Sequence, residues 1–298
     1  MKKILFVSSV IVITALTLTA CGSKAGAVDL LAQVKEHGYI ISATDPNYEP
    51  QSFLNTEGVR PADTLCPSDT LTTAEMQGFD IDVAHEIADR LGVELCLATP
   101  DWDIVTAGSW ADKWDFHVGS MTIKGTRPDV LYFTTPYYAP SAVFAVGADS
   151  TYTSQEDLVG TTLCAAVSTT YEDWLNGILD PAGLVILAEP PADVTVVSVS
   201  TDQECAQAME AGRTDFVGYV TSVTVVDANI AAGIPVKQLG EPVFIEPNAV
   251  AFDKSSTLNP TSLVEAVDQI VLEMHADGTL SALSIQWFGS DLTQGLAE

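Results

Sequence analysis

The feature that most restricts the fold of this chain is the alternation of short apolar segments with segments of helical periodicity. Residues 39–43 have the pattern of a buried strand, residues 79–91 place apolar side chains at helical spacing, and residues 93–97 alternate as a strand does. The same order, a helix followed by a strand, returns over residues 201–218. Strands separated by helices of this length predict an α/β fold with mostly parallel sheets, covered by helices on both faces.

Ligands of such sheets gather at the carboxyl ends of the strands. One expected strand begins at Phe116 and runs out into Ser120, and the loop after it holds Thr122 and Arg127. Arginine presents a planar fork with a permanent charge, which suits a site that binds a carboxylate through two hydrogen bonds. The loop is therefore a candidate anion site, and a solvated surface arginine is the alternative interpretation.

Two further strand ends carry polar side chains. A strand over residues 162–167 leads directly into Ser168 and Thr170, at the start of an expected helix. Free backbone N–H groups at a helix N-terminus attract anions, although the same hydroxyls would also serve as ordinary N-caps. The third strand end, near Tyr219, offers a phenol and a hydroxyl but no charge.

The first two dozen residues have the pattern of a bacterial lipoprotein signal. Lys2 and Lys3 precede an apolar run that is short for a membrane span and ends in small residues before Cys21, like a lipobox. We expect residues 1–20 to be a signal peptide and residues 21–35 a tether lipidated at Cys21, so that the mature protein is extracytoplasmic and anchored to the cell membrane. An uncleaved anchor helix with an incidental cysteine is the alternative.

The charge of the chain limits its partners. There are 40 acidic residues against 12 Lys and Arg, and the formal net charge is -28. Such a chain does not seek nucleic acid or anionic lipid. The apolar content of 47% supports a real core, and 298 residues suit one large or two medium domains.

The strand-end residues and several short motifs resemble the bacterial extracellular solute-binding proteins of family 3, the substrate-binding lipoproteins of polar amino-acid ABC transporters. The resemblance covers most of the mature chain. The motifs that carry it are Gly78–Ala84, Ser120–Ile123 with Arg127, Tyr132–Tyr138, Leu158–Gly160, Thr169–Glu172, Ala276–Thr279 and Gln286–Gly289.

The resemblance implies a two-lobed periplasmic-binding-protein-like fold of type II, whose two mostly parallel sheets carry flanking helices and are joined by a two-strand hinge. Lobe I would comprise residues 36–138 and 249–298, the latter including the C-terminal tail, and lobe II residues 142–245. A monomer is the default for such a hinged receptor.

Four cysteines follow the lipobox, an even number that is consistent with disulfides in an exported chain. Of the three pairings, we favour Cys66 with Cys96 and Cys164 with Cys205, because each bond then stays within one implied lobe and leaves their relative motion free. Free buried thiols are the alternative. The four histidines are scattered, so we expect no metal site and no cofactor.

The resemblance also implies a ligand site. Arg127 would hold a ligand carboxylate, helped by Thr122, the backbone near Ser120 and the helix start at Thr170. Tyr48 and Trp102 would form an aromatic lid, and Asp45 matches a position that approaches a basic ligand side chain in some relatives.

Two positions depart from the family pattern. Val220 stands where relatives that bind α-amino acids usually place an aspartate for the ligand ammonium, so another acid must substitute or the ligand lacks that group. The candidate substitutes are Asp45, Glu49 and Glu172. Gln51 replaces a usual aromatic, and it is followed by an extra segment, residues 60–77, that holds Cys66.

The implied function is a receptor that binds an amino acid or related small carboxylate between its lobes and delivers it to an ABC transporter permease, without catalysis. One alternative is an enzyme on the same scaffold, since cyclohexadienyl dehydratases resemble these receptors. The other is a ligand sensor that signals to a membrane partner.

Overall fold

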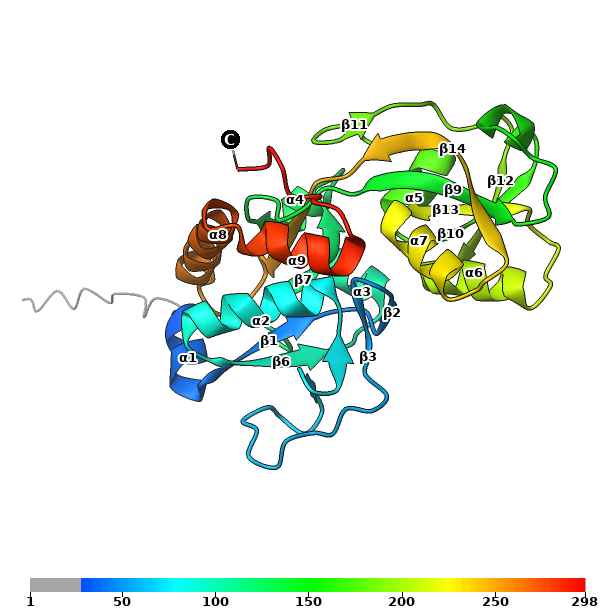
Figure 1. The fold of residues 1–298 in the computed structure, drawn as a ribbon. Coiled ribbons are helices and arrows are strands. Elements are labelled where there is room, and N and C mark those ends of the chain that lie inside the picture. Colours follow the sequence, from blue (N-terminus) through cyan, green and yellow to red (C-terminus); the bar gives the residue numbers. More distant parts are fainter. Residues whose placement is uncertain (1–27, 298) are drawn as a thin grey trace, which may run out of the picture.

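The structure is a computed structural model that describes residues 28–297. The signal peptide and Cys21 predicted above lie outside these residues. The described chain forms two lobes side by side, each built on a six-stranded sheet (Figure 1). No helix within the described range is long and apolar enough to cross a membrane.

The first sheet has the strand order β4-β6-β1-β7-β15-β8. Strand β1 pairs in parallel with β6 and β7, whereas β15 is antiparallel to β7 and β8, and β4 is antiparallel to β6. The parallel centre agrees with the sequence pattern, and the antiparallel strands make the sheet mixed. The strands are β1 (Tyr39–Ala43), β4 (Leu71–Thr72), β6 (Glu94–Ala98), β7 (Phe116–Thr122), β8 (Leu131–Phe133) and β15 (Asn248–Asp253).

Helices cover this sheet, and a small three-stranded sheet borders it. The helices are α1 (Leu30–His37), α2 (Phe79–Leu91), α3 (Trp102–Thr106), α4 (Arg127–Val130), α8 (Thr261–Ala276) and α9 (Thr279–Phe288). The small sheet contains β2 (Asn47–Tyr48), β3 (Ser52–Leu54) and β5 (Met76–Gln77).

Helix α2 shows how the sequence pattern produces the core of lobe I. Its apolar stripe, including Val83, Ile87 and Leu91, is buried against the sheet, as the spacing predicts. Asp80 and Asp82 lie in the first turn, where the helix dipole favours acids. The helix ends at Gly92, which adopts the left-handed conformation with φ 70° and donates its N–H to the last turn.

The second sheet, in lobe II, has the order β11-β14-β9-β13-β10-β12. Strand β10 is parallel to β12 and β13, and the remaining pairs are antiparallel. The strands are β9 (Ser141–Gly147), β10 (Thr162–Ala166), β11 (Val185–Ile186), β12 (Thr195–Val199), β13 (Gly218–Ser222) and β14 (Val236–Ile245). The helices are η1 (Gln155–Leu158), a single 3-10 turn, and α5 (Thr170–Leu175), α6 (Asp202–Glu210) and α7 (Val223–Ala231).

The chain crosses between the lobes twice, once before β9 and once between β14 and β15. The two crossings are hydrogen-bonded to each other: the Glu246 N–H donates to the Pro140 carbonyl at 3.1 Å, and the Asn248 N–H donates to the Tyr138 carbonyl at 2.9 Å. These paired segments form the connection that the resemblance implied as a hinge.

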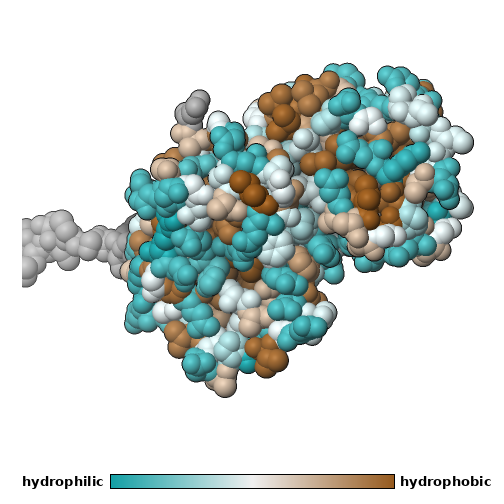
Figure 2. Space-filling view, viewed as in Figure 1, coloured by the Kyte–Doolittle hydropathy of each residue, from teal (hydrophilic) through white to brown (hydrophobic). Residues whose placement is uncertain are grey.

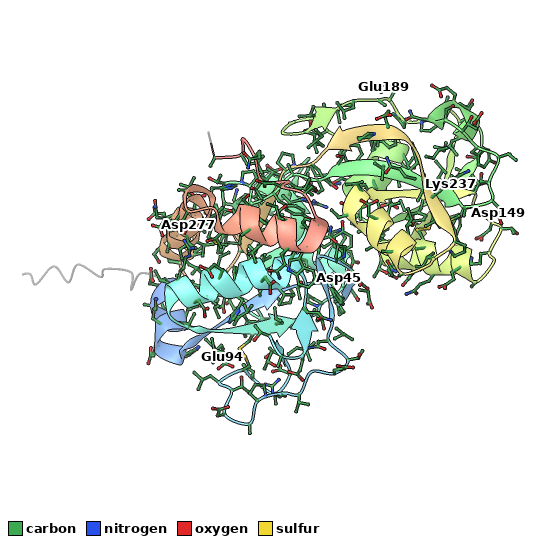
Figure 3. The ribbon with its side chains drawn as sticks, viewed as in Figure 1. Asp45, Glu94, Asp149, Glu189, Lys237 and Asp277 are labelled. Atoms are coloured by element: carbon green, nitrogen blue, oxygen red, sulfur yellow. A yellow bond between two sulfur atoms is a disulfide. The ribbon has the colours of Figure 1, made fainter. Side chains whose placement is uncertain are left out.

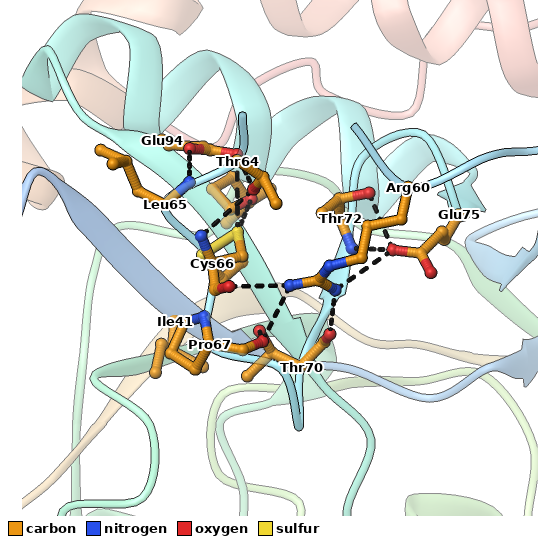
Figure 4. The surroundings of a disulfide bond; sticks show 12 residues. Ile41, Arg60, Thr64, Leu65, Cys66, Pro67, Thr70, Thr72, Glu75 and Glu94 are labelled. Atoms are coloured by element: carbon orange, nitrogen blue, oxygen red, sulfur yellow. Dashed lines mark hydrogen bonds and ion pairs between the residues drawn. A yellow bond between two sulfur atoms is a disulfide. The ribbon is translucent and has the colours of Figure 1, made fainter. Parts of the chain in front are cut away.

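Each lobe contains one disulfide, Cys66–Cys96 in lobe I and Cys164–Cys205 in lobe II. The first ties the extra segment to β6 (Figure 4). Arg60 fixes the same segment, since its guanidinium donates to the carbonyls of Cys66 at 2.7 Å, Pro67 at 2.9 Å and Thr70 at 2.6 Å. Neither disulfide joins the two lobes.

The visible surface is mixed in hydropathy, with a brown apolar area on lobe II near β11 (Figure 2). Val185 and Leu187 at that strand are 52% and 53% exposed. The large apolar side chains that determine the fold are otherwise collected in the two lobe interiors.

Candidate functional site

A cavity lies between the two lobes. It has about 480 Å³ of empty space, which includes space open to solvent. The predicted residues that line it are Asp45, Tyr48, Trp102, Ser120, Thr122, Arg127 and Thr170. The other lining residues, which are not among the predicted ligand-binding residues, are Gly119, Ala166, Thr169, Tyr171, Ser200, Thr201, Asp202 and Glu246.

Arg127 is the buried cation of the cavity. It begins α4, and its guanidinium donates to the Thr122 carbonyl of lobe I at 2.9 Å and to the Ser168 carbonyl of lobe II at 2.8 Å. The indole of Trp102 lies 5.2 Å from its guanidinium carbon. Burial lowers the pKa of Arg127 to about 10, so the group is charged at neutral pH. Within residues 28–297 it makes no salt bridge, which leaves its charge for a ligand anion.

Hydrogen bonds from within lobe I fix the position of Ser120. Its φ of 58° is left-handed, its N–H donates to the Tyr137 hydroxyl at 2.9 Å, and its hydroxyl donates to Asp80 at 2.6 Å. Tyr137 also donates to Asp80, at 2.7 Å. Burial raises the pKa of Asp80 to about 7, although both hydrogen bonds act against this rise. The first turn of α2 therefore positions the end of β7 at the cavity.

Thr122 and Thr170 meet across the cleft, with 3.1 Å between their hydroxyl oxygens. Thr122 donates to Glu246 at 2.7 Å, and the Tyr171 hydroxyl donates to the other oxygen of the same carboxylate. Burial raises the pKa of Glu246, while these hydroxyls and Arg127 favour its charged form. Sequence reasoning missed Glu246, although it lies in the predicted crossing between the lobes.

Two predicted ligand-binding residues do not line the cavity. The carbonyl oxygen of Ser168 accepts from the Arg127 guanidinium at 2.8 Å and from the Trp102 indole N–H at 3.3 Å. Tyr219 points into the interior of lobe II, where its hydroxyl accepts from Asn229 at 3.1 Å. Val220, on the opposite face of β13, packs with Phe144 in the lobe II core.

The three candidate substitutes for the missing aspartate have different surroundings. Asp45 lines the cavity, and Figure 3 shows it at the edge of lobe I that faces lobe II. Glu49 is exposed. The Glu172 carboxylate accepts from the Ser168 N–H at 2.7 Å and from the Ser198 hydroxyl, outside the cavity lining. Asp202, which was not among the candidates, lines the cavity from lobe II.

The lobes touch around the cavity as they would in a closed receptor. Gln51, the second departure from the family pattern, donates from its side-chain amide to the Thr224 hydroxyl on α7. At a second contact between the lobes, Lys124 of lobe I donates to the Thr169 carbonyl of lobe II at 3.1 Å and forms an ion pair with Asp173 of α5.

Comparison with known proteins defines the class. The chain matches the family model of bacterial extracellular solute-binding proteins, family 3, over residues 40–290. It is 27% identical over 267 residues to the L-cystine-binding protein TcyJ of Escherichia coli (strain K12), an alignment that covers 89% of this chain and 88% of TcyJ. It is 27% identical over 307 residues to the L-cystine-binding protein TcyA of Bacillus subtilis (strain 168), and this alignment covers 99% of this chain and 100% of TcyA.

Solved structures agree with this result. The structure of an ancestral arginine-binding protein bound to arginine matches with a TM-score of 0.67 and 25% identity, and the match covers 85% of this chain and 99% of that chain. The chain therefore belongs to the bacterial extracellular solute-binding proteins of family 3, the extracytoplasmic amino-acid-binding components of ABC transporters.

The relatives are named as binding proteins, and this chain is a binding protein and not an enzyme. Across residues 28–297, no three His, Cys, Asp or Glu side chains are grouped so that they could hold a metal ion.

Proposed function

We propose that the protein is a monomeric, lipid-anchored receptor that captures an α-amino acid in the cavity between its lobes and delivers it to the permease of an ABC importer. The ligand carboxylate binds Arg127, with Ser120, Thr122 and the N-terminus of α5 around it. Tyr48 and Trp102 cover the ligand from lobe I.

The observation that carries this proposal is the state of Arg127. Its side chain is 6% exposed and charged, yet its hydrogen bonds go to two carbonyl oxygens and, among the described residues, to no carboxylate. Burying a charge is costly unless an opposite charge compensates it. A ligand carboxylate supplies that charge and simultaneously touches parts of both lobes.

The names of the relatives narrow the first ligands to try. TcyJ and TcyA are named as L-cystine-binding proteins, and the ancestral protein was solved with arginine. Both ligands combine an α-carboxylate with more than one positive group. The carboxylates of Asp45, Asp202 and Glu246 around the cavity are compatible with such ligands.

The test is a thermal-shift screen of the soluble form that begins after Cys21, against the twenty common amino acids and L-cystine. A ligand that binds the native state raises the melting temperature. We expect a shift with at least one amino acid, its loss in Arg127→Gln, and its retention in Arg213→Gln, which removes an exposed arginine paired with Asp215 in lobe II. No shift with any amino acid contradicts the proposed ligand class.

The lipid anchor and importer partner are separate parts of the proposal. The lipobox-like sequence supports the anchor, and the family supports the importer. In a bacterial host fed a labelled fatty acid, the full chain should be labelled and Cys21→Ser should not; equal labelling of both contradicts the anchor. Co-purification of the ligand-bound receptor with an amino-acid permease tests the partner.

A further inference from the structure

Strand β13 brings no acid to the cavity. Val220, which stands where the resemblance implies an aspartate, is fully buried in the apolar core of lobe II. The next residue, Thr221, lies on the other face of the strand, and its hydroxyl is buried without a hydrogen-bond partner. The Thr221 hydroxyl lies beside the carboxyl group of Asp202, the first residue of α6.

Asp202 is a buried acid that lacks a cation. Its side chain is 7% exposed, it lines the cavity between the lobes, and its Oδ1 atom has no hydrogen-bond partner. It forms no salt bridge with any residue from 28 to 297. A buried carboxylate needs a cation or a set of donors to stay charged, so this group lacks a partner that a ligand can supply.

The surroundings of Asp202 favour a positive ligand group. Burial, together with the nearby charges of Asp45 and Glu246, raises the pKa of Asp202 to about 8, while the Thr221 hydroxyl acts to lower it. The charges of these acids repel one another, and a cation placed among them would relieve that repulsion. Neither nearby cation forms a salt bridge with Asp202: Arg127 donates to two carbonyl oxygens, and Lys124 is paired with Asp173.

The other acids of the cavity are weaker candidates for the same role. Both oxygens of Glu246 already accept a hydroxyl, from Thr122 and from Tyr171. Asp45 accepts from the Asn47 N–H at 2.8 Å and is only half-buried. Of these three acids, Asp202 is the one with a buried oxygen that has no hydrogen-bond partner, and it lines the cavity from lobe II.

We propose that Asp202 is the partner of the ligand's α-ammonium group and takes over, from the start of α6, the role that an acid at the end of β13 has in relatives. This inference rests on the proposed function. It makes Asp202 the residue that distinguishes an α-amino acid from the same molecule without its amino group.

The experiment compares each amino acid with its des-amino analogue. The pair is chosen by the ligand that gives the largest shift in the screen: L-arginine with des-amino-arginine, L-glutamine with glutaramate, or L-cystine with dithiodipropionate. Affinities are measured by calorimetry for the wild type, for Asp202→Asn and Glu246→Gln, and for the control Glu210→Gln, which removes an exposed acid from the other end of α6.

The wild type and Glu210→Gln should prefer the amino acid by about 100-fold or more, the effect expected for a buried charge pair. Asp202→Asn should lose most of this preference, while its affinity for the des-amino analogue stays within about threefold of the wild type. Adding Thr221→Asp to Asp202→Asn places an acid on the neighbouring strand end and should restore part of the preference.

Three results would overturn the inference. An unchanged preference in Asp202→Asn, with tight amino-acid binding, rejects the role of Asp202 and leaves the proposed function intact. Loss of the preference in Glu246→Gln but not in Asp202→Asn assigns the ammonium to Glu246 instead. Equal loss of both members of the pair in a folded Asp202→Asn protein, judged by circular dichroism, would show that the residue supports the site without recognising the amino group.

Discussion

At the scale of single residues, the cavity holds one buried cation against several acids. Arg127 is charged and lacks a carboxylate among the described residues, while Asp45, Asp202 and Glu246 all have raised pKa values because they are buried. A zwitterionic ligand can satisfy both kinds of group at once. The proposed ligand therefore supplies partners for groups whose charged forms are costly in the ligand-free protein.

This cost predicts how the stability of the ligand-free protein depends on pH. Burial raises the pKa of Asp202 to about 8 and that of Asp80 to about 7, so the folded state binds more protons than the unfolded state and stability falls as pH rises through these values. His117, whose pKa burial lowers to about 4, acts in the opposite direction only below its usual value of 6.5. The melting temperature should therefore fall between pH 6.5 and 8.5.

Asp202→Asn should reduce that fall. At pH 8.5 the ligand-free variant should be more stable than the wild type by about 1–3 kcal/mol, because the amide removes an unpaired buried charge. For a protein of this size each kcal/mol corresponds to about 2–4 °C. Scanning calorimetry of both proteins at the two pH values measures the difference, with Glu210→Gln as the control. Parallel pH profiles for wild type and Asp202→Asn would contradict an ionising, unpaired Asp202.

Some site residues can be predicted from the residues next to them in the sequence, and others cannot. Arg127 and Thr170 follow strands directly, so the rule that ligands gather at strand ends locates them. Asp202 reads in sequence as an ordinary first-turn acid of an amphipathic helix, a position that is usually solvated. Only the packing of α6 beside β13, with lobe I opposite, makes it a buried cavity residue, and no local pattern contains that information.

At the scale of elements, the same distinction holds. The stripe and terminal glycine of α2 are local patterns, and the structure confirms them. The antiparallel strands β9 and β15 result from two long-range crossings of the chain, which helix and strand periodicity does not specify. Strand β13 spans Gly218–Ser222, whereas the pattern began the strand at Asp215 and placed its end over 218–221, so the sequence located the element and its end but not its first residue.

The contact between Lys124 and helix α5 is predicted to control closure without touching the ligand. Neither Lys124 nor Asp173 lines the cavity, but their ion pair joins lobe I to lobe II. Breaking it should favour the open form and weaken amino-acid binding about tenfold, the effect of losing one charged hydrogen bond from the closed state alone. The variant of choice is Asp173→Asn.

This variant separates closure from simple electrostatics. Removing a negative charge near Arg127 would by itself strengthen the binding of a carboxylate, so weaker binding in Asp173→Asn identifies the loss of the contact between the lobes. Asp215→Asn, which breaks an exposed ion pair inside lobe II, should leave affinity unchanged. Affinity in Asp173→Asn equal to or higher than wild type would contradict the predicted effect.

At the scale of the whole molecule, the architecture suits a receptor whose output is closure. Each disulfide lies within one lobe, and the lobes are connected by two adjacent crossings, so they can move relative to each other. The proposed ligand contacts come from both lobes and exist together only when the lobes are closed. Binding therefore shifts the population toward the closed form, the form proposed to be read by the importer.

A crystal structure of the soluble protein with the amino acid that gives the largest thermal shift tests the proposed site most directly. We expect one ligand molecule between the lobes, with its carboxylate on the guanidinium of Arg127 and its α-ammonium within hydrogen-bond distance of Asp202. A ligand bound outside this cavity, or bound within it with its carboxylate away from Arg127, would contradict the proposed role of Arg127.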